Sequence, residues 1–291
     1  MELYTGVREI QVRAEVINQI YAEKTLEIDL EKRVFDKRLR FPNQNEYLHM
    51  QSLSTNQQAI ARVKGQHLVL VNGKDFTINN VTPRNLRQRM TFDALMDDTI
   101  QVVVLFGRAG TGKTLLTLAA GLHKMEAKTY RRFILSRPMS QLGKRQLGML
   151  PGDVDEKFGP YLDNYMDNIE HLLNGRYKST GDLISQFRCD FKPLQLIQGS
   201  SWAGAFAIVD ESQVLDWEEM VMLGTRVGEG SKIVIMGDLG QRVEKITPER
   251  TGMYKLVNDK RFQESPITAS IELTKCERGP VAELFAEIFG V

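Results

Sequence analysis

The chain has 291 residues, of which 42% are hydrophobic, and its 38 Lys and Arg residues nearly balance its 37 Asp and Glu residues. This length and composition predict one sizeable core with a smaller appended domain and argue against a disordered chain. Because the net charge is +1, any binding of nucleic acid must depend on local basic patches, which argues against a generally basic binder of the histone type.

The sequence also argues against a zinc site, a membrane span and secretion. Cys189 and Cys276 lie far apart, and no histidine stands at metal-ligand spacing from a cysteine or another histidine. The longest apolar stretches, such as Val102–Phe106, have the length of a core strand, far short of the roughly 20 residues that span a bilayer. Residues Met1–Arg13 are mixed and polar, unlike a secretory signal. We therefore expect a cytoplasmic protein without a membrane partner.

The N-terminal part predicts a small β-rich module, assigned to residues 1–82. Apolar and polar residues alternate at Leu26–Leu30, and His67–Val71 is a short apolar run; both are strand signals. Asn72-Gly73 follows the second run and precedes Phe76–Ile78, which is the pattern of a tight hairpin.

Residues 83–291 predict an α/β domain with a parallel sheet flanked by helices. Pro83-Arg84-Asn85 marks the joint, and from Leu86 onward helices of about ten residues or more alternate with compact apolar strands. The predicted strands are Val102–Phe106, Arg132–Ser136, Leu194–Ile197, Phe206–Val209, Lys232–Met236 and Ile271–Leu273.

The strongest functional signal is a glycine-rich loop between the strand that ends at Phe106 and the helical run Leu115–Met125. Its glycines let backbone N–H groups face phosphate oxygens, while Lys113 is expected to neutralise the β and γ phosphates and the Thr114 hydroxyl to bind Mg²⁺. The pattern predicts ATP and Mg²⁺ as ligands. The loop matches the P-loop pattern G-x-x-x-x-G-K-[ST] through Gly107, Arg108, Ala109, Gly110, Thr111, Gly112, Lys113 and Thr114.

A second signal is the apolar strand Ala205–Val209, which ends in Asp210 and Glu211. A strand of this kind is typical of the Walker B element. We expect Asp210 to hold Mg²⁺ through its water shell and Glu211 to polarise the attacking water. Two solvated acids at a strand exit are the alternative, which the complete P-loop disfavours.

Two glutamines extend the predicted site. A third strand ends in the turn Gly237–Gln241, which is expected to bring Gln241 close to the γ phosphate because the carboxyl ends of parallel strands line one crevice. Such a turn can also serve shape alone. Gln88, upstream of the first core strand, either reads adenine, as a glutamine does in helicase-like ATPases, or is a surface helix residue.

Together these residues resemble the PhoH-like P-loop ATPases, whose core is similar to one RecA-like lobe of superfamily 1 helicases. The resemblance covers Pro83 to Phe289 and implies a RecA-like fold, ATP hydrolysis with Mg²⁺ and helicase-like coupling to RNA or single-stranded nucleic acid. Besides the P-loop, the segments that carry it are Ser136-Arg137-Pro138, Leu147–Asp153, Lys157, Pro160-Tyr161-Leu162, Val209–Gln213, Thr225–Lys232 and Gly237–Gln241.

The chain also departs from the family pattern. Members often carry an N-terminal nuclease domain of the PIN type, and residues 1–90 are too short for that domain and the β-rich module together, so we expect no ribonuclease activity. Where many relatives have an Arg-Gly-Arg stretch, this chain has Gln198-Gly199-Ser200, which removes positive charge from an RNA contact. The segment Asp210–Val214 keeps both acids of the usual Asp-Glu-Ala-Gln-Asn, so hydrolysis is expected to survive.

A helicase closes two lobes around ATP, and the second lobe supplies an arginine that stabilises the transition state. The stretch after Gly237 is too short for a second lobe, so we expect a homo-oligomer, with a hexameric ring as one form, in which a neighbour supplies the arginine. The resemblance points to Arg226 and Arg278, and Arg137 is a third candidate. An ordinary surface arginine is the alternative for each.

Basic clusters give candidate contacts with nucleic acid at Arg84–Arg89, Arg131-Arg132 and Lys144-Arg145, although solvated faces have the same composition. Lys144-Arg145 stands among glycines, and we expect this loop to touch RNA or single-stranded DNA. A P-loop small-molecule kinase and a nucleotide-gated regulatory module with little hydrolysis are the competing functions. The pairing of Asp210 with Glu211 favours water as the nucleophile, and hence an ATPase.

Overall fold

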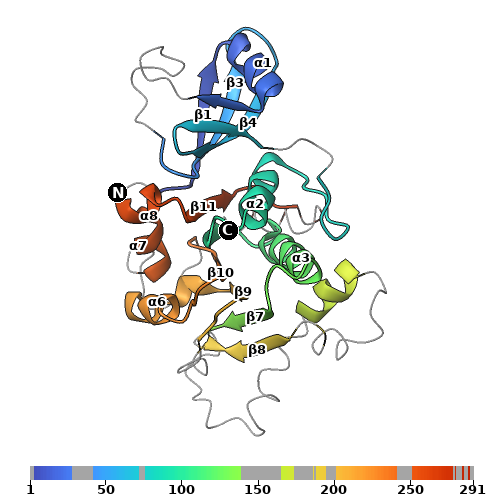
Figure 1. Cartoon of the computed structure of the whole chain (residues 1–291), viewed down its shortest axis with the longest axis vertical. Coiled ribbons are helices and arrows are strands. Elements are labelled where there is room, and N and C mark those ends of the chain that lie inside the picture. The colour runs from blue at the N-terminus through green and yellow to red at the C-terminus, as the bar shows by residue number, and fades with distance from the viewer. Residues whose placement is uncertain are drawn as a thin grey trace, which may run out of the picture.

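The computed structural model of the chain contains two β-sheets, one above the other in Figure 1. The upper sheet belongs to the N-terminal part, and the lower sheet is all-parallel with helices on both faces. The prediction of an α/β fold with a parallel sheet and an N-terminal β-rich module is therefore confirmed. The residues that the structure describes are 3–27, 42–71, 76–138, 165–173, 186, 188–194, 201–240, 251–277, 279, 284 and 288.

The N-terminal sheet has five strands in the order β1-β3-β4-β5-β2. β1 runs parallel to β3, and the other neighbours are antiparallel. Ile17 and Ile20 of the helix α1 are fully buried against Leu48, Met50 and other apolar residues of this sheet. The elements are β1 (Val7–Val12), α1 (Ala14–Glu23), β2 (Thr25–Glu27), β3 (Tyr47–Ser52), β4 (Gln58–Lys64) and β5 (His67–Leu70).

The second sheet has six parallel strands in the order β11-β6-β10-β9-β7-β8. Its inner strands are mostly buried and rich in apolar residues because helices cover both faces of the sheet, as is usual for parallel sheets. The strands are β6 (Val102–Gly107), β7 (Arg132–Arg137), β8 (Cys189–Pro193), β9 (Ala205–Val209), β10 (Lys232–Gly237) and β11 (Thr268–Leu273).

Two layers of helices enclose this sheet. On one face pack α2 (Leu86–Met96), α3 (Lys113–Glu126) and the helical residues 165–173, and on the other pack α6 (Trp217–Gly224), α7 (Gly252–Asn258) and α8 (Lys260–Glu264). A short 3-10 helix, η4 (Ser212–Val214), follows β9. Within the described part of the chain, no helix has both the length and the apolar character that crossing a membrane requires.

Two of the predicted strands differ from the described residues. Near the segment Leu194–Ile197 the structure has β8, which ends at Pro193, lies at the edge of the sheet and pairs with β7. Of the predicted segment only Leu194 is described, and it follows the strand instead of opening it. Phe76–Ile78 is not a strand, although Ile78 forms an isolated antiparallel bridge with Val81. The Phe76 ring packs edge-on against Phe92 of α2, with 5.9 Å between the ring centroids. The predicted hairpin residues Asn72-Gly73 lie outside the described residues.

A buried arginine and two partly exposed aspartates tie the N-terminal sheet to α2. Arg62 of β4 donates to Asp97 Oδ2 at 2.5 Å and pairs with Asp93 Oδ2 at 2.8 Å. The Tyr47 hydroxyl also donates to Asp93 Oδ2, at 2.8 Å. Burial opposes ionisation of Asp97, but hydrogen bonds from Thr99 and Arg62 outweigh it and hold the pKa of the Asp97 carboxyl below its ordinary value.

α2 is held at both ends. At its N-terminus the Asn85 side chain accepts a hydrogen bond from the backbone N–H of Gln88. At its C-terminus, Lys232 Nζ from β10 donates to the carbonyl oxygens of Ala94 and Leu95 at 2.8 Å and of Asp97 at 2.9 Å. Because the last carbonyls of a helix have no partner within the helix, this buried amino group supplies donors where they are needed, although burial lowers the pKa of Lys232 to about 7.

Candidate active site

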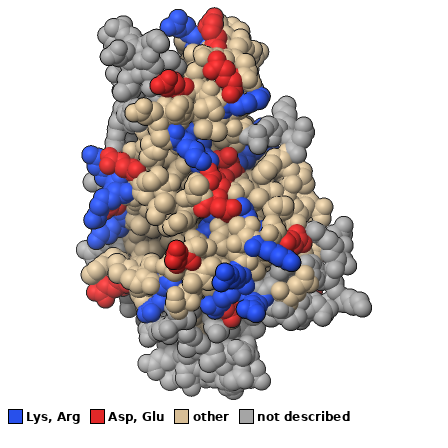
Figure 2. Space-filling model, in the orientation of Figure 1, with Lys and Arg blue, Asp and Glu red and all other residues tan. Residues whose placement is uncertain are grey.

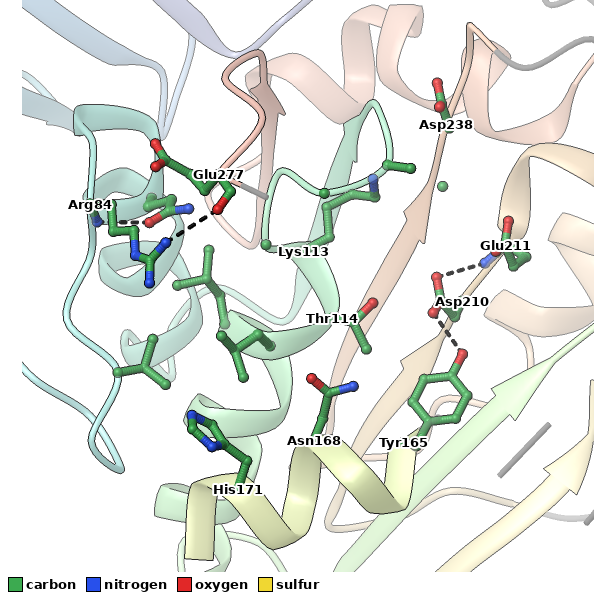
Figure 3. A pocket seen from close by; sticks show the side chains of 18 of the residues that line it. Arg84, Lys113, Thr114, Tyr165, Asn168, His171, Asp210, Glu211, Asp238 and Glu277 are labelled. Atoms are coloured by element: carbon green, nitrogen blue, oxygen red, sulfur yellow. Dashed lines mark hydrogen bonds between the residues drawn. The ribbon is translucent and has the colours of Figure 1, made fainter. Parts of the chain in front are cut away.

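Three neighbouring strands of the central sheet end on one cavity. β6 leads into the P-loop, β9 into Asp210 and β10 into Asp238, and the carboxyl ends of parallel strands meet at the same edge of a sheet. The cavity there has a volume of about 620 Å³. Figure 3 shows Lys113 and Thr114 on one side of it and Asp210 and Glu211 on the other. Groups that are about a hundred residues apart in the sequence are therefore neighbours in the fold.

Glycines give the loop between β6 and α3 its shape. Gly107, Gly110 and Gly112 have φ angles of +144°, +80° and +94°, which side chains with a Cβ rarely adopt. A Cβ on Gly107 would lie 2.0 Å from the carbonyl oxygen of Leu273 in the adjacent strand β11. The N-cap of α3 is Gly112, which supplies no side-chain acceptor, so the N–H groups of the first helical turn are suited to phosphate oxygens.

The lysine of the loop bends back over the loop itself. Lys113 Nζ donates to the carbonyl oxygens of Gly107 at 2.5 Å and Arg108 at 2.9 Å, and the Thr111 hydroxyl donates to the same Arg108 oxygen at 2.9 Å. Gly107, Arg108 and Thr111 thus shape the loop. The loop residues that line the cavity are Ala109, Gly110, Gly112, Lys113 and Thr114.

Asp210 is a buried carboxylate at the wall of the cavity, 8% exposed. Its Oδ2 accepts a hydrogen bond from the Tyr165 hydroxyl at 2.6 Å, and its Oδ1 accepts one from the backbone N–H of Glu211 at 2.9 Å. Burial raises the pKa of Asp210, an effect that the Tyr165 hydrogen bond and the Lys113 charge oppose and the Glu211 charge reinforces. A cation bound nearby would therefore stabilise the ionised form.

Glu211 is held from both sides of its carboxylate. Gln213 Nε2 donates to Glu211 Oε2 at 2.7 Å, and Arg137, at the end of β7, lies with Nη2 3.6 Å from Glu211 Oε1. The backbone of Glu211 has a φ of +54°, in the left-handed region, which is uncommon for a residue with a Cβ and recurs at functional sites. The fold thus fixes both the backbone and the side chain of this glutamate.

Gln213 also reaches the next strand. It is 1% exposed, and its Oε1 accepts a hydrogen bond from the backbone N–H of Asp238 at 3.2 Å. A Cβ on Gly237 would lie 2.6 Å from this Oε1. The absence of a side chain at position 237 therefore makes space for the Gln213 amide. One buried amide therefore joins Glu211, after β9, to the end of β10.

Gln88 lines the cavity but makes contacts within the protein. Its Oε1 accepts from the Arg84 backbone N–H at 2.8 Å, and its Nε2 donates to the Thr111 carbonyl oxygen at 3.1 Å. The side chain is 4% exposed, so it is not an ordinary surface residue. Since an amide has two donors and two lone pairs, one of each remains for a ligand, and the adenine contact stays a prediction.

Sequence reasoning missed the wall of the cavity opposite the P-loop. Tyr165, Asn168 and His171 lie on one side of the helical residues 165–173 and face the cavity (Figure 3). Their spacing of three residues is the available signal, since residues three apart share a helix face. Glu277, which also lines the cavity, was missed as well. Its backbone carbonyl accepts a hydrogen bond from Arg84 Nη1 at 3.2 Å, and its backbone N–H donates to the carbonyl oxygen of Gly110.

Arg226 lies at the other end of the sheet from this cavity. Its backbone carbonyl accepts a hydrogen bond from the backbone N–H of Trp202 at 2.8 Å, and Trp202 precedes the first residue of β9. Arg226 therefore lies near the amino end of that strand. The five residues of β9 span about 16 Å at about 3.3 Å per residue, which is beyond the reach of an arginine side chain. Any contact of Arg226 with a nucleotide therefore needs the site of another subunit.

Several predicted residues lie outside the described part of the chain. Gln241, Arg278 and the Lys144-Arg145 loop are among them, as is the family segment Leu147–Asp153. Their predicted roles remain predictions.

The cavity residues fit Mg²⁺. Among the described residues, no group of three or more His, Cys, Asp or Glu side chains is arranged to hold a metal ion. Mg²⁺ does not need such a cage, because it usually takes one or two protein oxygens, water and substrate phosphates. Thr114 and the buried carboxylate of Asp210, whose pKa burial raises, supply oxygens of this kind across the cavity.

A P-loop after one parallel strand and two acids after another, on the same edge of the sheet, define a P-loop nucleotide-binding protein of the ATPase type. The sequence matches the PhoH family, described as PhoH-like protein, over residues 80–290. The chain belongs to the PhoH family, and the resemblance read from its sequence is confirmed.

The relatives include two proteins named PhoH2. The chain is 33% identical over 293 residues to the one from Bacillus subtilis, covering 99% of this chain and 64% of the relative, and 30% identical over 287 residues to the one from Mycolicibacterium smegmatis, covering 98% and 62%. The chain thus spans less than two thirds of the length of either. Among solved structures it is similar to the HK97 bacteriophage large terminase, with a TM-score of 0.41 and 11% identity over 73% of this chain and 44% of that one. Similarity at that level does not transfer a function.

Proposed function

We propose that this protein hydrolyses ATP with Mg²⁺ and couples hydrolysis to RNA or single-stranded nucleic acid. The observation that supports hydrolysis most directly is the convergence of Lys113, Thr114, Asp210 and Glu211 on one cavity. Phosphate binding needs the first two, and activation of water needs a carboxylate near the γ phosphate.

In this proposal the N-terminus of α3 and Lys113 bind the phosphates, and Thr114 and Asp210 hold Mg²⁺. Bound Mg²⁺ would neutralise charge that develops on the phosphate oxygens. The contact of Lys113 Nζ with its own loop carbonyls gives way to contacts with the phosphates, which are the stronger partners because they are charged.

Glu211 is the proposed acceptor of the proton from the attacking water. A general base acts well when its orientation is fixed beforehand. The hydrogen bond from Gln213 and the nearby Arg137 guanidinium support that orientation. Arg137 lines the same cavity, so it can also stabilise transition-state charge within one subunit.

A homo-oligomer is the second part of the proposal. Because Arg226 lies at the opposite end of the sheet from the P-loop of its own chain, it can act only in the site of a neighbour. α6 also exposes Trp217 by 53% and Val221 by 59%, and these residues, four apart, share one helix face. Contiguous exposed apolar surface is a feature of subunit contacts, and this helix face is where we propose one.

Binding of nucleic acid is the third part. On the face shown in Figure 2, Lys and Arg side chains alternate with Asp and Glu side chains, so a local cluster must supply the charge. Of the basic residues at Arg84–Arg89, Arg84 donates to the backbone carbonyl of Glu277 and Arg87 pairs with the Glu272 carboxylate. Exposed basic residues instead surround a second cavity of about 380 Å³, and they are Lys128, Arg131 and Arg188.

Phosphate release tests the proposal. Purified protein is assayed with ATP in Mg²⁺ or EDTA, and then with single-stranded RNA, single-stranded DNA or duplexes at low salt. We expect Mg²⁺-dependent release that single strands accelerate, with the acceleration falling as salt rises. Replacement of Lys128, Arg131 and Arg188 by Glu should remove the acceleration and leave basal release unchanged. Absence of phosphate release under every condition would reject hydrolysis. A rate of phosphate release that does not change when nucleic acid is added would reject the coupling.

A further inference from the structure

The helical residues 165–173 present two kinds of side chain to two neighbours. Ile169, Leu172 and Leu173 are buried in the core beside α3 and the central sheet. Tyr165, Asn168 and His171 turn toward the nucleotide cavity instead. The apolar stripe therefore anchors the helix, and the polar stripe forms a wall of the site.

Tyr165 is the member of this wall that touches a proposed ligand of Mg²⁺. Its hydroxyl donates to Asp210 Oδ2 at 2.6 Å, and the side chain is 4% exposed. The other carboxylate oxygen of Asp210 accepts the Glu211 N–H at 2.9 Å. Two donors on different oxygens fix the plane of a carboxylate, which a single donor would leave free to rotate about its last bond.

The geometry leaves the Asp210 carboxylate able to accept further hydrogen bonds from a ligand. An ionised carboxylate has about four lone-pair sites, and these two donors use two of them. Asp210 still lines the cavity across from Thr114. In Figure 3 the amide of Asn168, one helical turn from Tyr165, is turned toward Thr114.

We propose that Tyr165 is a positioning residue for magnesium: its hydroxyl holds the Asp210 carboxylate in the plane that receives a water of the Mg²⁺ shell. This inference rests on the proposed function, because it assumes that Mg·ATP occupies the cavity. It assigns a role to a helix that lies between β7 and β8 in the sequence, away from both nucleotide-binding motifs. Partners that orient a metal ligand in this way commonly set metal affinity.

The test is the magnesium dependence of nucleotide binding, measured without turnover. A fluorescent ATP analogue is titrated into the wild type and Tyr165→Phe, first in EDTA and then at fixed nucleotide with increasing Mg²⁺. For Tyr165→Phe we expect unchanged affinity in EDTA and a half-saturating Mg²⁺ concentration raised by roughly 10-fold. Phenylalanine keeps the ring and its packing, so the change isolates the hydroxyl.

Tyr130→Phe is the matched control. The Tyr130 hydroxyl also donates to an aspartate, Asp98 Oδ1 at 3.0 Å, but neither residue lines the nucleotide cavity. We expect this variant to bind ATP and Mg²⁺ like the wild type. In an Asp210→Asn background, Tyr165→Phe should add little, because its effect passes through that carboxylate.

Two results would overturn the inference. One is a Mg²⁺ midpoint for Tyr165→Phe equal to that of the wild type. The other is an equal loss of affinity in EDTA and in Mg²⁺, which would mean that Tyr165 supports the wall and not the metal ligand. Both leave the proposed function intact, whereas wild-type protein that binds no ATP in either condition would end the proposed function itself.

Discussion

Replacing Gln213 by Leu removes the amide that joins Glu211 to the end of β10 while keeping a side chain of similar size. The Gln213 Nε2 to Glu211 Oε2 hydrogen bond, at 2.7 Å, is the direct loss, and the buried Asp238 N–H loses its acceptor as well. A hydrogen bond to a charged group contributes roughly 1.5–3 kcal/mol. If that energy holds Glu211 in its productive orientation, its loss lowers kcat by roughly 10- to 100-fold.

The assay is steady-state phosphate release together with calorimetric titration of Mg·ATP. We expect kcat to fall while the Kd for Mg·ATP stays close to the wild-type value, because Gln213 does not line the cavity. Gly237→Ala should act in the same direction, since its Cβ would lie 2.6 Å from Gln213 Oε1. Gln263→Leu is the control, because this buried glutamine bonds to Val257 in α7, outside the cavity. An unchanged kcat in a folded Gln213→Leu protein would refute the reasoning.

Three further predictions concern stability and assembly. Lys232→Met should lower the free energy of unfolding by roughly 2–4 kcal/mol in urea titrations, because buried carbonyls at the end of α2 lose their donor; wild-type stability would contradict this role. The pKa of Asp97 is held below its ordinary value. The ionised Asp97 carboxylate therefore adds to the free energy of unfolding above about pH 4, and this stabilisation is lost as pH falls further. Asp97→Asn should therefore have a lower free energy of unfolding than the wild type at neutral pH and lose less of it on acidification. If the free energies of unfolding of the two proteins changed with pH in parallel, that result would count against the Arg62 contact. Arg226→Ala should bind ATP with wild-type affinity but hydrolyse it slowly. If subunits share sites, mixing it with Glu211→Gln should restore activity, and no recovery in a mixed oligomer would exclude a role for Arg226 in a neighbour's site.

The P-loop and the two acids could be predicted to meet at one cavity because each belongs to a local pattern. Glycines with positive φ, a lysine and a threonine stand together in the P-loop, and Asp210 and Glu211 follow directly on an apolar strand. Since parallel strands align their carboxyl ends, chain order was enough to bring Thr114 and Asp210 to one cavity. The same logic applies to Arg226, which precedes β10 and therefore lies at the amino end of the sheet.

The surroundings of these groups could not be predicted because they depend on packing between distant segments. Tyr165 meets Asp210, and Arg137 meets Glu211, across strand and helix boundaries that no spacing rule connects. Gln88 lines the cavity, yet its amide bonds to Arg84 and Thr111, which its type alone does not indicate. β8 was misplaced because an edge strand lacks the apolar run that marks a central one.

Single-turnover phosphate release by Glu211→Gln, set beside its binding of Mg·ATP by calorimetry, tests the central claim most directly. Glutamine keeps the size of the side chain and removes the proton acceptor. The account predicts wild-type affinity for Mg·ATP with release slowed by on the order of 100-fold or more. Release at the wild-type rate would show that Glu211 does not activate the water, and would contradict the assignment of this cavity as an ATP-hydrolysing site built around that residue.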